Sequence, residues 1–139
     1  MFYGATLTSN ADNKFNLTFR DFPEINVEAK SKDKALALAK EQLLEAIYIH
    51  YSRTNELPVR GPLEQDDVKV VLPVSLDAKV KLIQELRKLG LSNAEMARKL
   101  GVRYQDVQRL FDLRHNTKID QIADAFDVLG IQLGITLSS

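Results

Sequence analysis

Residues Ser92–Leu113 read SNAEMARKLGVRYQDVQRLFDL, and this stretch predicts two short helices joined by a tight turn. Serine is a residue type that caps helix N-termini, so Ser92 predicts a first helix over Asn93–Lys99. Gly101 follows where the chain must reverse sharply, and a residue without a Cβ adopts such a conformation at the lowest cost. A second helix is expected from about Arg103 to Leu113.

The small and apolar residues of this stretch have the spacing of a helix-turn-helix. Counted from Asn93 as position 1, the motif needs a small residue at position 5 and a turn residue at position 9, and Ala97 and Gly101 stand there. The motif also needs apolar residues at positions 4, 8, 10, 15 and 18, which are Met96, Leu100, Val102, Val107 and Leu110. Such residues let the helices cross closely and hold the second helix outward as a ridge.

The outer face of the second helix favours DNA binding over an ordinary helical hairpin, which would have the same apolar spacing. Arginine and glutamine are suited to guanine and adenine edges in the major groove. From Lys88 to Lys118 there are seven basic and three acidic residues, in a chain with a formal net charge of +0. The predicted DNA-binding residues are Ser92, Arg103, Tyr104, Gln105, Gln108, Arg109, Arg114 and Lys118.

Length and composition indicate a soluble globular protein with one ordinary domain or two small ones. The chain has 139 residues, of which 45% are hydrophobic and 27% are charged. The absence of cysteine excludes disulfides, thiolate metal sites and a cysteine nucleophile, and it fits a reducing compartment. No apolar run could span a bilayer, and no basic region precedes an apolar stretch at the N-terminus. We therefore expect a cytoplasmic protein without a membrane segment.

The first half of the sequence predicts a small ββ-α-β layer of the α+β class. The expected elements are strands at Phe2–Thr8, Lys14–Arg20 and Ile25–Glu28, a helix at Lys32–Tyr51 capped by Ser31, and a strand at Val68–Leu72. The order strand, strand, helix, strand resembles part of a ribonuclease H-like sheet. We assign residues 1–73 to this layer and residues 74–139 to a helix-turn-helix domain.

A metal-dependent nuclease is one alternative for this layer, because ribonuclease H-like sheets hold divalent metals through strand carboxylates. The first strand has no carboxylate, however, and Asp12, Asp21, Glu24 and Glu28 lie in turns or at strand edges. The two histidines are far apart in sequence, and there is no Ser/His/Asp set or phosphate-binding glycine loop. We therefore predict no catalytic residue, no metal site and no cofactor.

The second half predicts two more helices around the helix-turn-helix and a strand at its end. Ser75 is expected to cap a helix over Leu76–Lys88, and Thr117 is expected to cap a helix that Gly130 ends. In the last segment, apolar residues alternate with polar residues or glycine, which is the spacing of a strand. These apolar residues are Ile131, Leu133, Ile135 and Leu137.

A terminal strand without a local partner is a liability in a monomer, because its edge is apolar and unpaired. Pairing with the same strand of a second chain solves this by two-fold symmetry. We therefore predict a homodimer, or a higher even oligomer, formed through Ile131–Leu137. The alternative is that this segment folds back onto its own domain.

The segment Phe19-Arg20-Asp21-Phe22-Pro23-Glu24, followed closely by an alanine- and leucine-rich helix, resembles the antitoxin family called HicB. In the helix-turn-helix branch of that family, a sheet domain is followed by a Pro-rich crossing, a Val-rich strand and a Cro/repressor-type DNA-binding domain. The matching parts of this chain are Pro58–Pro62, Val68–Leu72 and the sequence from Ser75 onward. The chain departs from many members in having Ala29-Lys30-Ser31 instead of a Gly-Glu/Asp-Thr turn before the long helix.

The resemblance implies an antitoxin that binds a HicA-type toxin, which resembles a double-stranded-RNA-binding domain and cleaves mRNA. The first domain would cover the toxin's catalytic face, and the second would repress the shared operon at operator DNA. An RNA-cleaving surface is basic, and residues 1–66 carry eight basic and ten acidic groups, so the charges are complementary. The candidate toxin-binding residues are Asp12, Asp21, Glu24 and Glu28. The alternative is a free-standing repressor whose first domain senses a small ligand.

Overall fold

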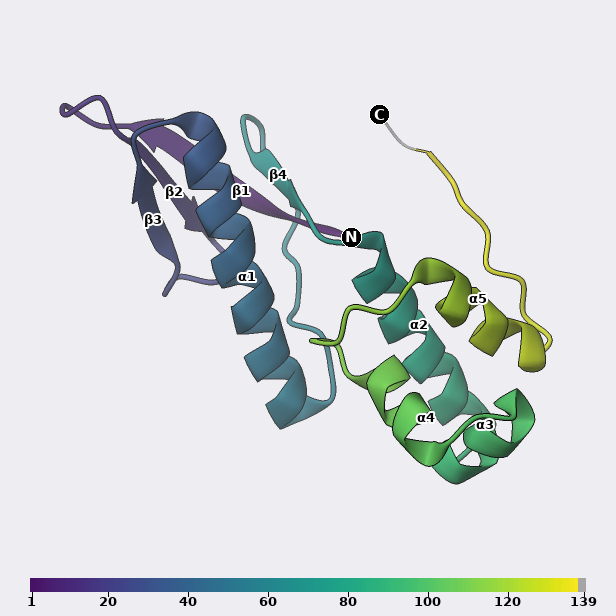
Figure 1. The fold of residues 1–139 in the computed structure, drawn as a ribbon. Coiled ribbons are helices and arrows are strands. Elements are labelled where there is room, and N and C mark those ends of the chain that lie inside the picture. The colour runs from purple at the N-terminus through teal and green to yellow at the C-terminus, as the bar shows by residue number, and fades with distance from the viewer. Residues whose placement is uncertain (138–139) are drawn as a thin grey trace. The chain divides into compact units, whose positions relative to one another are not determined.

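A computed structural model of the chain describes residues 1–137 as a mixed α+β fold with an antiparallel sheet followed by several helices (Figure 1). The elements follow the order β1, β2, β3, α1, β4, α2, α3, α4 and α5. They form two compact units, Met1–Leu72 and the part that begins at Pro73. None of the helices in the described range combines the length and the apolarity that a bilayer crossing demands.

The first unit is a four-stranded antiparallel sheet covered on one face by a helix, with strand order β3-β2-β1-β4 (Figure 1). Its elements are β1 (Phe2–Ser9), β2 (Phe15–Phe19), β3 (Asn26–Ala29), α1 (Lys32–Thr54) and β4 (Val68–Val71). Ala5 lies opposite Phe19 and Leu7 lies opposite Leu17, so apolar residues of neighbouring strands share one face. The strands and the helix expected from sequence are present, and the observed order is βββ-α-β, with the short segment near Ile25–Glu28 forming the third strand.

Helix α1 packs against this apolar face through a stripe of alanine and larger aliphatic residues. The buried residues of the helix are Ala35, Ala39, Leu43 and Ile47. Leu36 and His50 of the same helix are only half-buried. The cap is as predicted, because the Ser31 side chain accepts a hydrogen bond of 3.1 Å from the Lys34 backbone N–H.

The residues after β2 hold the crossing loop, which we define as residues 55–67 between α1 and β4. Arg20 Nη1 donates to Asp67 Oδ1 at 2.9 Å, and Arg20 Nη2 donates to the other carboxylate oxygen. Asp67 also accepts from the Glu64 backbone N–H at 2.8 Å. The hydrogen bond from Arg20 lowers the pKa of the Asp67 carboxyl to about 2. Asp21 Oδ1 accepts from the Gly61 backbone N–H at 3.0 Å, so both carboxylates fix this loop to the sheet unit.

Apolar contacts support the same loop from within the unit. The rings of Tyr3 and Phe22 meet edge to face with centroids 5.3 Å apart, and the Tyr3 hydroxyl donates to the Pro58 carbonyl at 2.9 Å. Gly4 lies where the loop comes closest to β1, and a Cβ there would stand 2.9 Å from atoms of Asp67 and Leu63. A larger residue at this position would therefore have to displace the side chains of Asp67 and Leu63.

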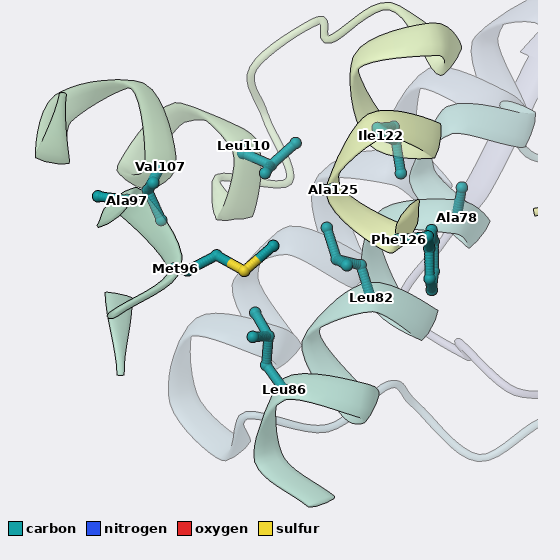
Figure 2. Close-up of a cluster of buried hydrophobic side chains, with 10 residues drawn as sticks. All are labelled: Ala78, Leu82, Leu86, Met96, Ala97, Val107, Leu110, Ile122, Ala125 and Phe126. Carbon is teal, nitrogen blue, oxygen red and sulfur yellow. The ribbon is translucent and has the colours of Figure 1, made fainter. Parts of the chain in front are cut away.

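The second unit consists of four helices around one apolar core. They are α2 (Val74–Leu89), α3 (Asn93–Leu100), α4 (Tyr104–Phe111) and α5 (Ile119–Val128). Figure 2 shows the core side chains, to which all four helices contribute: Ala78, Leu82, Leu86, Met96, Ala97, Val107, Leu110, Ile122, Ala125 and Phe126. Gly101 between α3 and α4 has a φ of 67°, in the left-handed region that favours glycine. The two short helices and the turn predicted from sequence are therefore confirmed.

Some of the predicted helix ends need correction. Ser92 does cap α3, and its Oγ accepts from the Glu95 backbone N–H at 3.1 Å. Ser75 lies inside α2, because Pro73, which has no N–H to satisfy, already occupies the cap position. Thr117 is also not a cap: it is buried, and its hydroxyl lies 3.1 Å from His115 Nδ1. Helix α5 instead begins after Lys118, whose backbone is extended.

Residues 131–137 form no strand within the single chain, and the predicted pairing of this segment with a second chain stays a prediction. The Ile131 N–H donates to the Phe126 carbonyl at 3.0 Å, and Ile131 and Leu133 pack against the helical core, as the alternative expected. Ile135 and Leu137 are 86% and 91% exposed. Alternating residues form a strand only when a neighbour supplies a backbone ladder, and no element of residues 1–137 supplies one here.

The Arg20–Asp67 contact predicts an acid-sensitive sheet unit. The pKa of Asp67 is about 2 in the folded chain and 3.8 ordinarily, so its stabilisation is complete above pH 4 and is lost as the pH falls towards 2. Asp67→Asn should lower the urea concentration at which β1 and β4 are half unfolded near neutral pH. In the variant, that concentration should also fall less as the pH is lowered. NMR signals of these strands in the full chain would measure this.

Asp66→Asn is the matched control, because it removes a carboxylate one residue away at a left-handed position that asparagine tolerates. An equal response of the two variants would contradict the assigned role of Asp67.

Candidate nucleic-acid interface

Helix α4 presents its polar residues to solvent and its apolar residues to the core. Val107 and Leu110 are buried, whereas Tyr104 and the residues that follow it on the outer face are exposed. All eight predicted DNA-binding residues are exposed side chains: Ser92, Arg103, Tyr104, Gln105, Gln108, Arg109, Arg114 and Lys118. The structure thus leaves this face accessible, and the assignment of these residues to DNA stays a prediction.

Asp106 connects two of the candidate arginines, and sequence reasoning did not single it out. Its Oδ2 accepts from the Arg103 backbone N–H at 3.2 Å, and its two carboxylate oxygens lie 3.4 Å from Arg103 Nε and Nη2. Arg109 Nη1 lies 3.8 Å from Asp106 Oδ1. The hydrogen bond from the Arg103 side chain lowers the pKa of the Asp106 carboxyl. Asp106 therefore orients both arginines, as its position three residues from each could have suggested.

Lys79 contacts the C-terminal end of α4 from the core side of the helix. The side chain comes from α2 and is 1% exposed, although lysine is rarely buried. Its Nζ donates to the carbonyls of Arg109, Asp112 and His115 at 3.3, 2.7 and 2.6 Å. Burial lowers the pKa of this ammonium, and the Asp112 carboxylate opposes the shift. One cation thus satisfies three backbone acceptors where α4 ends and the next loop begins.

The turn and the loop on either side of α4 enclose a cavity of about 520 Å³. Leu100, Val102 and Leu110 supply apolar lining, and Asp106 and Arg109 supply polar lining. Val102 is exposed, contrary to the buried position that the motif assigned to it. Ser92 also has an internal role, because its hydroxyl donates to Glu95 Oε1 at 3.1 Å at the start of α3.

The four candidate toxin-binding carboxylates do not form one surface. Asp21 and Glu24 both line a groove of about 730 Å³ between the residues after β2, the second half of α1 and the crossing loop. Glu28 instead lies on β3, where it is 3.3 Å from Lys14 Nζ, and Asp12 lies in the turn between β1 and β2. Among residues 1–137, no three His, Asp or Glu side chains are grouped so that they could hold a metal ion.

Comparisons with known proteins identify similar sequences. Residues 2–81 match the family model described as the HicB-like antitoxin of bacterial toxin–antitoxin systems. Antitoxin HicB 1 of Photorhabdus laumondii is 32% identical over 99% of this chain and 87% of its own length. Antitoxin HicB 2 of that organism is 38% identical over 83% of this chain and 81% of its own length. Antitoxin HicB of Escherichia coli K12 is 31% identical over 99% of each.

Replacement of Lys79 tests the buried cap of α4. Lys79→Met keeps most of the side-chain volume but leaves three carbonyls without their donor, so the helical unit should lose about 1–3 kcal/mol of unfolding free energy. Thermal and urea unfolding would measure the loss, and NMR shifts should concentrate in residues 109–118. Lys81→Met, on the same helix but exposed, is the control, and an equal loss in both variants would contradict the assigned role.

Proposed function

Because the chain belongs to the HicB-like antitoxin family, we propose that it is a dual-role antitoxin that neutralises a HicA-type toxin and represses its own operon. The sheet unit, which we interpret as part of a ribonuclease H-like sheet, would bind the mRNA-cleaving toxin. The helical unit would bind operator DNA as a Cro/repressor-like domain. On this proposal the protein is a binding protein and not an enzyme.

The observation that carries the DNA-binding role is the polar, solvent-facing side of α4. A helix reads the major groove only if it protrudes and carries side chains that can bond base edges. Gln105, Gln108 and Arg109 have that chemistry and are exposed. Arg114 and Lys118 follow in the next loop, where exposed cations suit backbone phosphates. Base reading by the helix and phosphate binding by the loop are therefore assigned separately.

Two copies of the chain would bind one operator. Ile135 and Leu137 project from the helical unit with nearly all of their apolar surface in solvent. Pairing of this segment with its counterpart in a second chain would cover those side chains and supply the backbone ladder that a single chain lacks. Ile131 and Leu133 would anchor the segment to its own core. The two α4 helices of such a dimer would meet half-sites roughly 34 Å apart.

Alanine substitutions separate base readers from phosphate contacts. Gln105→Ala or Arg109→Ala should cost about 1–3 kcal/mol of operator affinity and relax specificity at one base pair, whereas Lys118→Ala should weaken binding to all sequences alike. Binding of the purified chain to the DNA upstream of its gene, and to base-substituted copies, would be measured at several salt concentrations. An equal loss of affinity for all DNA sequences in all three variants would contradict the assignment of Gln105 and Arg109 as base readers.

Charged substitutions in the C-terminal segment test the dimer. The double variant Ile135→Asp, Leu137→Asp should stay folded, become monomeric and bind the operator weakly, because carboxylates cannot be buried in the proposed pairing. Sedimentation equilibrium and an operator titration would show this. Val128→Asp places one carboxylate on an exposed apolar position of α5 and should leave the dimer intact. A double variant that still dimerises would refute the pairing.

A further inference from the structure

We infer that the groove of the sheet unit is the surface that binds the basic toxin, an assignment that rests on the proposed function. The groove has a volume of about 730 Å³, and α1, the segment after β2 and the crossing loop all line it. Phe22 and Ile25 are its buried apolar residues, and Ile49 and Val59 are its exposed apolar residues. It thus combines a cavity, an apolar centre and a charged margin, which is the anatomy of a protein–protein interface.

The charge of the groove selects a cationic partner. Its lining carries three carboxylates, those of Asp21, Glu24 and Glu45, against one guanidinium, that of Arg53. A surface that binds and cleaves RNA is basic, so these charges attract it, speed the encounter and exclude acidic competitors.

The face of the sheet that α1 does not cover carries charges of both signs, because Arg20 is paired there with Asp67 and Glu64. Lys69 of β4 lies opposite Gly4 of β1, on the side away from the apolar face. Lys69 Nζ and the Arg60 guanidinium lie 4.8 and 4.7 Å from the centroid of the Phe2 ring, and Arg20 also belongs to this side. The groove has an excess of carboxylates and this face does not, so the groove is the better of the two surfaces for a basic toxin.

The crossing loop presents an apolar side chain on a fixed backbone. Val59 is 88% exposed, so most of its apolar side chain is in contact with solvent in the single chain. It lies between Pro58, whose carbonyl accepts from the Tyr3 hydroxyl at 2.9 Å, and Gly61, whose N–H donates to Asp21 at 3.0 Å. Little conformational entropy is then lost when a partner covers Val59, because its backbone is already held.

This assignment divides the four carboxylates into different roles. Asp21 positions the loop through Gly61, whereas Glu24 is exposed at the margin of the groove and faces the partner. Glu45 of α1 joins Glu24 as a second partner-facing carboxylate. Asp12 and Glu28 lie outside the groove and make no contact with the toxin.

Paired charge reversals test the assignment. Glu45→Lys and Glu41→Lys each reverse one exposed carboxylate of α1, one turn apart, but only Glu45 lines the groove. Glu24→Lys and Asp12→Lys form a second pair inside and outside the groove. The probe is a catalytically inactive form of the HicA-type protein that the proposed function gives this chain as its toxin. Each groove variant should weaken binding of that protein at least about tenfold, more at low salt, and each control should change it less than about twofold.

Val59→Asp supplies an apolar test of the same surface and should weaken binding at all salt concentrations. Thermal unfolding of every variant reports whether the sheet unit still folds. If the wild-type chain binds the toxin and the groove and control variants weaken it equally, the groove assignment is overturned and the proposed function stands. If the wild-type chain does not bind that protein, the toxin-neutralising function itself fails.

Discussion

The helical unit depends on one buried cation. An ammonium taken out of water loses several kcal/mol of hydration unless polar groups replace it, and Lys79 finds three carbonyl oxygens within 3.3 Å. Two of these acceptors belong to Arg109 and Asp112 at the C-terminus of α4, where the helix dipole concentrates negative partial charge. The carbonyl oxygens that replace the lost hydration of Lys79 therefore also attract its positive charge. The lowered pKa of Lys79 reflects the cost, and its hydrogen bonds show what offsets it.

This arrangement leaves the outer face of α4 free for a partner. A helix of eight residues is too short to be stable alone, so tertiary contacts must hold it in place. Val107 and Leu110 hold its inner face in the core, and Lys79 holds its end. Asp106 adds order within the helix by engaging Arg103 and Arg109. None of these contacts uses Gln105 or Gln108, which remain available to bond base edges.

Local patterns made much of the fold predictable. The caps at Ser31 and Ser92 and the turn at Gly101 depend on neighbours within a few residues, and all three are confirmed. The apolar periodicity of α3 and α4 likewise predicted which side chains are buried and which candidate DNA-binding residues are exposed.

Contacts between distant residues were not predictable in the same way. Lys79 lies 30 to 36 residues from its three acceptors, and its position in a helix suggests only a solvated surface side chain. Arg20 and Asp67 are 47 residues apart, so the motif after β2 gave no sign of its partner. The alternation at Ile131–Leu137 does not say which partner the segment takes, because a strand is a property of two paired segments.

Both units place their candidate binding residues on backbone that buried or half-buried polar side chains hold in place. Backbone N–H and C=O groups in a turn or at a helix end need partners, and apolar packing cannot supply them. Lys79 satisfies carbonyls at the end of α4, and Asp21 satisfies the Gly61 N–H of the crossing loop. The exposed side chains nearby, Arg109 and Val59, are therefore presented in defined positions before any partner arrives. Less ordering entropy then opposes binding, which favours specific recognition by an otherwise small protein.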